Sequence, residues 1–163
     1  MSDLINKKSI KLITASGKVL EISTEIIYHA ESLLPGILTA NKGNVNGLIS
    51  NFNRAMISIS QSLVQVNYEI VQAEKALKLV KAKIILDDLP EKIKSYRSMG
   101  IKDNADIRES IVLSDEDYQK HEDILNRLRA VKELLQVKYN MFDRSYWDAK
   151  ASAELTKNSL SKE

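Results

Sequence analysis

The stretch VNGLISNFNRAMISISQSLVQVNYEIVQAEKALKLVKAKI, residues 45–84, decides the fold. Apolar residues recur in it at gaps of alternately four and three: Val45, Ile49, Phe52, Met56, Ile59, Leu63, Val66, Ile70, Ala73, Leu77, Val80 and Ile84. This 3.5-residue repeat keeps one apolar seam along a single helix, and the seam needs a partner helix to hide it from water. A helix of this length spans about 60 Å, so we expect an elongated helical assembly.

A second long helix is predicted to begin at Ser114-Asp115-Glu116-Asp117, where serine caps the helix and three carboxylates oppose the helix dipole. Its apolar positions are Leu128, Val131, Leu135, Tyr139, Phe142, Tyr146, Ala149 and Ala153, with Trp147 beside them and partly exposed. The intervening chain is long enough to reverse direction, which predicts an antiparallel helical hairpin or coiled coil. The remaining seam is available for a homo-oligomer, with these interface residues: Ile49, Phe52, Met56, Ile59, Leu63, Val66, Ile70, Tyr139, Phe142 and Tyr146.

Short helices are predicted between the two long ones. The first long helix should end near Asp87-Asp88, and Asp88-Leu89-Pro90-Glu91 then has a carboxylate cap, an early proline and a glutamate three positions after the cap. This short helix reaches about Ser98, before Gly100, and a further helical turn is expected over residues 104–111.

The amino-terminal region differs from the rest of the chain. Residues 9–15 and 19–23 are rich in β-branched side chains, and Ser16-Gly17 between them suits a tight turn, because glycine tolerates a positive φ. We expect a β-hairpin, followed by a short helix over residues 24–34 that Pro35-Gly36 stops. The predicted organisation is a hairpin region, 1–36, and an elongated helical region, 37–163, in one folding unit of mostly α class.

The composition favours a cytoplasmic protein without enzymatic activity. The chain has no cysteine, its amino-terminal residues contain no apolar signal core, and no run of about eighteen apolar residues could cross a membrane. His29 and His121 are far apart, and neither a glycine-rich phosphate loop nor a serine–histidine–aspartate arrangement occurs. We therefore expect no catalytic residues, no metal, no cofactor and no membrane partner.

The charges are distributed in blocks. Residues 71–102 carry a net charge of +4, residues 103–125 carry −6, and residues 126–163 carry +3. A track of cations suits a phosphate backbone. The candidate nucleic-acid-binding residues are Lys75, Lys78, Lys81, Lys83, Lys92, Lys94, Tyr96 and Arg97. Two alternatives to nucleic-acid binding stay open. The cations could simply belong to solvated helix faces, and Tyr96 could be a packing residue instead of a ring that stacks on an unpaired base.

One motif resembles a known family. Val80-Lys81-Ala82-Lys83-Ile84 is similar to the Leu-Lys-Ala-Arg-Leu-Asp-Tyr motif of phage recombination mediators of the UvsY type. Ile111-Val112-Leu113-Ser114-Asp115-Glu116-Asp117 is similar to the start of that family's last helix, and the likeness covers about residues 70–150.

The resemblance implies a small helical oligomer with roles in DNA recombination, replication and repair. Such a protein binds single-stranded DNA and helps a RecA-like recombinase replace a single-strand-binding protein, in the cytoplasm of an infected bacterium if the chain is phage-encoded. The DNA-contacting residues would be Lys81 and Lys83, where Lys83 keeps the charge of the family's arginine but not its planar fork.

Two functions follow from the sequence. The first is a non-enzymatic recombination mediator, in which an oligomer presents repeated basic clusters to single-stranded DNA while the acidic block at residues 115–123 docks a recombinase. The alternative is a structural or interaction coiled-coil protein without DNA binding, such as a virion component, an assembly adaptor or a regulator that sequesters a partner.

Overall fold

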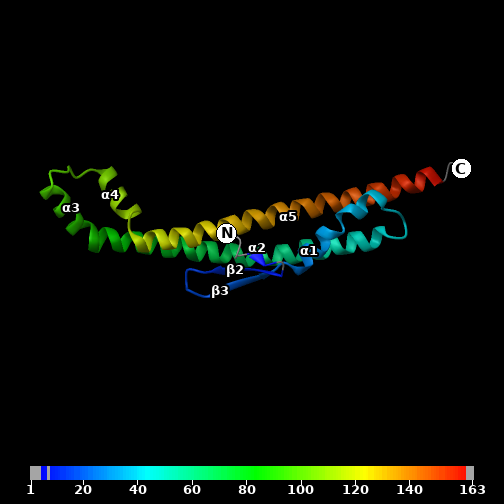
Figure 1. Ribbon diagram of the computed structural model, residues 1–163, viewed down its shortest axis with the longest axis horizontal. Coiled ribbons are helices and arrows are strands. Elements are labelled where there is room, and N and C mark those ends of the chain that lie inside the picture. Colours follow the sequence, from blue (N-terminus) through cyan, green and yellow to red (C-terminus); the bar gives the residue numbers. More distant parts are fainter. Residues whose placement is uncertain (1–4, 7, 161–163) are drawn as a thin grey trace. The chain divides into compact units, whose positions relative to one another are not determined.

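The computed structural model describes residues 5–6 and 8–160. The amino-terminal segment that was predicted to contain no apolar signal core lies partly outside these described residues. The described chain is mostly helical, as predicted (Figure 1). The elements in order are β1 (Ile5–Asn6), β2 (Ser9–Ile13), β3 (Val19–Ser23), α1 (Glu25–Ser32), the 3₁₀ helix η2 (Leu34–Thr39), α2 (Val45–Lys83), the π-helix η3 (Ile84–Asp88), α3 (Leu89–Ser98), α4 (Ala105–Leu113) and α5 (Glu116–Leu160).

The predicted hairpin is confirmed as β2 and β3. Gly17 has a φ of +79°, and the turn closes where the Thr14 amide donates to the Lys18 carbonyl at 2.8 Å. Side chains alternate along β2, with Ile10 and Leu12 buried and their neighbours more exposed. The short strand β1 pairs antiparallel with β2 and makes a third strand that the sequence did not predict, since two residues are too few for an alternation pattern.

Helix α1 ends at Ser32, but Pro35 and Gly36 do not stop the helical conformation. Both lie inside η2, where proline occupies the first turn, at which a missing amide hydrogen breaks no helical bond. The predicted short helix is therefore confirmed as α1, a separate 3₁₀ helix follows it to Thr39, and Ala40 is extended.

The apolar seam of α2 lies where the 3.5-residue repeat places it. None of its twelve residues is exposed: Phe52, Ile59, Val66, Ile70, Ala73 and Ile84 are buried, and the other six are half-buried. On α5 the eight predicted apolar positions are likewise buried or half-buried, whereas Trp147 is 60% exposed. The periodicity therefore predicted the inward faces of both helices.

The short helix predicted to reach about Ser98 is confirmed as α3, but the predicted break before it at Asp87-Asp88 was wrong. The chain continues from α2 through the π-helix η3 into α3, and the Leu89 amide donates to the Ile84 carbonyl five residues back. Asp88 makes no side-chain capping bond to any residue that the structure describes. Pro90 has no amide hydrogen, so it cannot donate to Leu86 in an α-helix, and a wider turn before a proline accommodates that loss.

The chain divides into two compact units, each built from separate parts of the sequence. The first comprises residues 1–12, 19–67 and 130–163, and the second comprises residues 13–18 and 68–129. The predicted boundary between residues 36 and 37 therefore falls inside the first unit. In that unit Phe52 on α2 and Phe142 on α5 are fully buried and stack with ring centroids 6.0 Å apart.

The second unit has its own apolar cluster, in which Ile84, Val112 and Tyr118 are buried and Leu77 and Val80 pack against them. Within this unit Arg129 of α5 also pairs with Glu74 of α2 at 2.8 Å. Tyr118, early in α5, packs against residues near the end of α2, whereas Arg129, later in α5, pairs with the earlier Glu74. Inside the second unit, the two long helices therefore run antiparallel, as predicted.

Candidate nucleic-acid interface

The four predicted lysines of α2 are exposed, and none forms an ion pair with a residue that the structure describes. Lys75, Lys78 and Lys81 are three residues apart, and each step turns about 60° backward around an α-helix. They therefore follow a shallow spiral, and Lys83 lies on the opposite flank of the helix. Their charges face solvent, where a polyanion could reach them.

The cations of α3 differ from one another in their surroundings. Lys92 lies 3.7 Å from the carboxylate of Asp115, so part of its charge is already opposed within the chain. Lys94 is exposed and, among residues 8–160, has no ion-pair partner. The predicted basic track is therefore not uniform, because acidic residues from later in the sequence approach some of its members.

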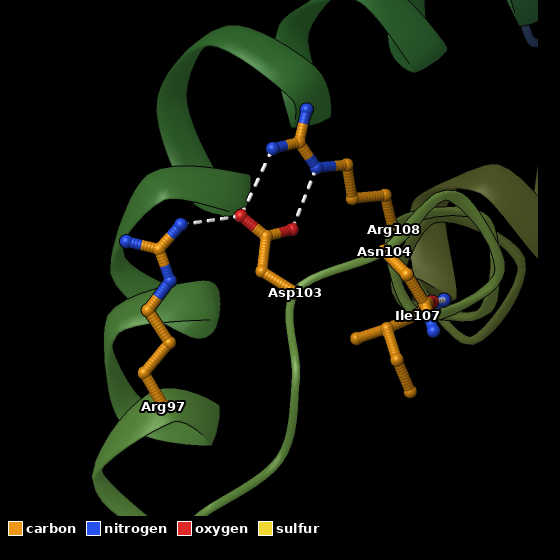
Figure 2. Close-up of polar contacts among 5 residues, drawn as sticks. All are labelled: Arg97, Asp103, Asn104, Ile107 and Arg108. Atoms are coloured by element: carbon orange, nitrogen blue, oxygen red, sulfur yellow. Dashed lines mark hydrogen bonds and ion pairs between the residues drawn. The ribbon is translucent and has the colours of Figure 1, made fainter.

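Arg97 is held by a carboxylate that the sequence analysis did not single out. Figure 2 shows its guanidinium and that of Arg108 directed at Asp103, with Arg97 Nη2 at 2.6 Å and Arg108 Nε at 2.8 Å. Arg108 Nη2 adds a second bond at 3.0 Å. The two hydrogen bonds from Arg108, and then the single one from Arg97, lower the pKa of Asp103 to about 2. We call these three residues the Asp103 clamp.

Local sequence explains how the clamp is built. Gly100, with a φ of +79°, follows the end of α3, and two backbone hydrogen bonds close this end. The Gly100 amide donates to the Arg97 carbonyl, and the Ile101 amide donates to the Tyr96 carbonyl. This pairing satisfies the last carbonyls of α3 and reverses the chain. Asn104 then caps α4, since its Oδ1 accepts the Ile107 amide at 2.9 Å. Asp103 lies between these two helix ends, within reach of an arginine on each.

Two side chains of the clamp were missed at the sequence level for a specific reason. Asp103 and Arg108 fall in the block that is acidic on average, residues 103–125, and a block average hides an individual pair. The available signal was a short polar loop between a glycine helix end and an asparagine cap, with arginines on both sides. Such a loop brings neighbouring helix ends close together.

Tyr96 is half-buried, and its carbonyl accepts two of the amides that end α3. A ring that stacks on a base needs an exposed face, so its surroundings favour packing over stacking. Tyr68, on the second unit's part of α2, is 62% exposed. It lies about 20° from Lys75 around the helix, so this exposed ring is beside a cation although it falls outside the basic block of residues 71–102.

The acidic block is partly occupied by contacts within the chain. Asp115, not the predicted Ser114, caps α5: its Oδ1 accepts the amides of Asp117 and Tyr118 at 3.0 and 3.3 Å. Ser114 instead donates to the Ile111 carbonyl at 3.1 Å. Both amides donate to the same carboxylate oxygen, and hydrogen bonds to an ionised acceptor are stronger than those to a hydroxyl, which favours Asp115 as the cap.

The predicted oligomer interface needs correction at five positions. Phe52, Ile59, Val66, Ile70 and Phe142 are buried by the single chain, so they form its own core and have no surface to offer a second subunit. The other five positions are half-buried and stay predictions: Ile49, Met56, Leu63, Tyr139 and Tyr146.

No helix within residues 8–160 is long and apolar enough to span a bilayer. In the same part of the chain, no three histidine, aspartate or glutamate side chains come together as ligands for a metal ion. Comparison with protein-family models, with curated proteins and with solved structures finds no match to this chain.

Proposed function

We propose that this chain is a non-enzymatic recombination mediator, which binds single-stranded DNA and promotes the loading of a RecA-like recombinase in place of a single-strand-binding protein. The observation that carries the DNA-binding part is the exposure of Lys75, Lys78, Lys81 and Lys83 on α2, where none has an ion-pair partner within the described part of the chain. Cations without a carboxylate partner release counterions from a phosphate backbone on contact, and this release drives binding without reading the base sequence.

The mediator part rests on the resemblance of residues 80–84 and 111–117 to the UvsY type. Lys81 and Lys83, which that resemblance assigns to DNA, are both exposed. Glu116, Asp117 and Asp123 are exposed on α5 and supply an acidic surface for a protein partner. A homo-oligomer would repeat the lysine cluster along one strand, so that weak single contacts add up to firm retention.

The competing function, an interaction protein without DNA binding, is favoured by a different observation. Tyr68, Val71 and Leu79 are exposed on the second unit's part of α2, interspersed with the lysines and opposite the buried seam. An apolar row on an exposed helix face suits a partner helix. Under this proposal the lysines only keep that face soluble.

The test is fluorescence anisotropy with a labelled oligonucleotide over a series of salt concentrations. We expect binding to weaken steeply with salt, and the double variant Lys81→Ala, Lys83→Ala to bind less tightly. Its plot of log affinity against log salt should be flatter by about 1.4, because each lost phosphate contact on a single strand removes about 0.7 from the slope.

A matched control removes two other exposed lysines that have no described ion pair, Lys18→Ala and Lys132→Ala. Light scattering on the same samples checks that the oligomeric mass is unchanged. Equal effects of the two double variants would remove the proposed site, and no binding at low salt would favour the interaction protein.

The mediator step is tested separately on an oligonucleotide coated with single-strand-binding protein. Adding this chain should shorten the lag before a RecA-like recombinase assembles on the strand. The double lysine variant should leave the lag as long as it is without the chain. A chain that binds the strand but does not change the lag would retain DNA binding and lose the mediator role.

A further inference from the structure

Two hollows lie between the η3–α3 segment and α4, all within the second unit. One, of about 450 Å³, is lined by residues of η3, α3, the following loop and α4, including Ile93, Lys94 and Arg97. The other, of about 400 Å³, is lined by Lys81, Glu109 and Val112 among others. They share Ile85, Leu89 and Arg108, so they form one concave surface.

The floor of this surface is apolar. Leu89 is buried, and Ile85 is 42% exposed although it faces the hollow. Pro90 and Ile93 extend the apolar lining along α3. Binding sites for small molecules combine a concave apolar lining with a few polar groups. An occupant that removes Ile85 from water would therefore be stabilised by apolar burial.

The rim of the same surface is basic. Four cations line it, Lys81, Lys94, Arg97 and Arg108, against two carboxylates, Asp103 and Glu109, which leaves a net charge of +2. Of the two carboxylates, Asp103 pairs with both arginines, whereas Glu109 forms no ion pair with a residue that the structure describes. The rim therefore attracts an anion even after its internal pairs are counted.

The Asp103 clamp also leaves donors free for a ligand. Arg97 uses only Nη2 and Arg108 uses Nε and Nη2, so Nη1 of each arginine has no described partner. Because the clamp already orders both guanidiniums, an arriving phosphate loses less side-chain entropy than it would with free arginines. Fixed arginine forks recognise phosphate oxygens well.

We propose that this concave surface binds one nucleotide of the single strand, with its base against Ile85, Pro90 and Ile93 and its phosphate beside Lys94, Arg97 and Arg108. The inference rests on the proposed function and deepens it, since the exposed lysines of α2 explain attraction to phosphates but provide no contact for a base. Lys81, which lines the hollow, connects the two sets of contacts.

The test compares two labelled oligonucleotides of equal length, one of thymidines and one of abasic sites, in the anisotropy assay. We expect the base-bearing strand to bind about five-fold more tightly, because the floor removes part of the base from water. Ile85→Ser should bring this ratio close to one while leaving the salt dependence unchanged.

Leu86→Ser is the matched control. Leu86 is the next residue of η3, is 74% exposed and lines neither hollow, so its substitution should preserve the ratio. As a second measurement, an oligonucleotide carrying 5-iodo-deoxyuridine is crosslinked by light to the unaltered protein. We expect crosslinked peptides from residues 85–97 or 103–112.

The possible results distinguish a failure of the proposed function from a failure of the nucleotide site alone. If neither oligonucleotide binds at low salt, the proposed function fails and this inference fails with it. If both bind equally well, if Leu86→Ser changes the ratio as much as Ile85→Ser, or if crosslinks fall only elsewhere, the nucleotide site is overturned while phosphate binding by α2 stands.

Discussion

The two compact units of this chain are stabilised by different interactions. The first contains a fully buried aromatic pair, Phe52 and Phe142, whereas the second has a small apolar cluster and fixes its α3–α4 connection with the Asp103 clamp. Apolar burial depends little on moderate salt, but pairs with exposed arginines weaken in it. The candidate binding residues of α2 and α3 therefore lie in the unit whose α3–α4 connection is fixed by charge.

The largest effect should come from the aromatic core of the first unit. Phe142→Ala leaves a cavity beside Phe52, and we expect the free energy of unfolding to fall by about 4 kcal/mol in urea denaturation. Trp147→Ala is the control, because that ring is 60% exposed and should cost far less. A loss under 1 kcal/mol for Phe142→Ala would contradict the importance of the aromatic pair.

A smaller effect should distinguish two glycines that lie in different conformations. At Gly100 a φ of +79° suits glycine alone, so Gly100→Ala should lower the free energy of unfolding by about 1 kcal/mol and loosen the clamp. Gly47, within α2, has open space at the position of a Cβ and an ordinary φ. Gly47→Ala should therefore raise the same quantity by up to about 1 kcal/mol. Equal signs for the two variants would refute this assignment.

The smallest expected effect is the change in stability when Asp103 is protonated in acid. The pKa of Asp103 is lowered from its ordinary value of 3.8 to about 2, so the ionised clamp contributes stability above pH 3.8 and loses it as the pH falls through about 2. A carbon-13 NMR titration of the Asp103 carboxyl should show this midpoint. Arg108→Gln should raise it, since Arg108 is the larger cause. A midpoint near 3.8 in the unaltered protein would mean that the clamp does not persist in solution.

Much of the fold and part of the candidate site could be predicted from local pattern. The seam from Val45 to Ile84 predicted which face of α2 is inward, and Ser16-Gly17 predicted a turn with a positive φ. The exposure of the α2 lysines follows from the same periodicity, because residues opposite an apolar seam face water. The partner of Lys92 could not be predicted, since Asp115 lies at the start of a helix much later in the sequence.

The sequence by itself therefore determined the helix faces, the hairpin and the surplus of charge, because each depends on spacing over a few residues. Only the tertiary structure decided that a π-helix carries the chain into α3 just before Pro90 and that Phe52 and Phe142 belong to the chain's own core. It also decided that Asp103 joins two arginines beside an apolar hollow. These outcomes depend on which side chains meet when separate elements pack, and a one-dimensional pattern does not contain that information.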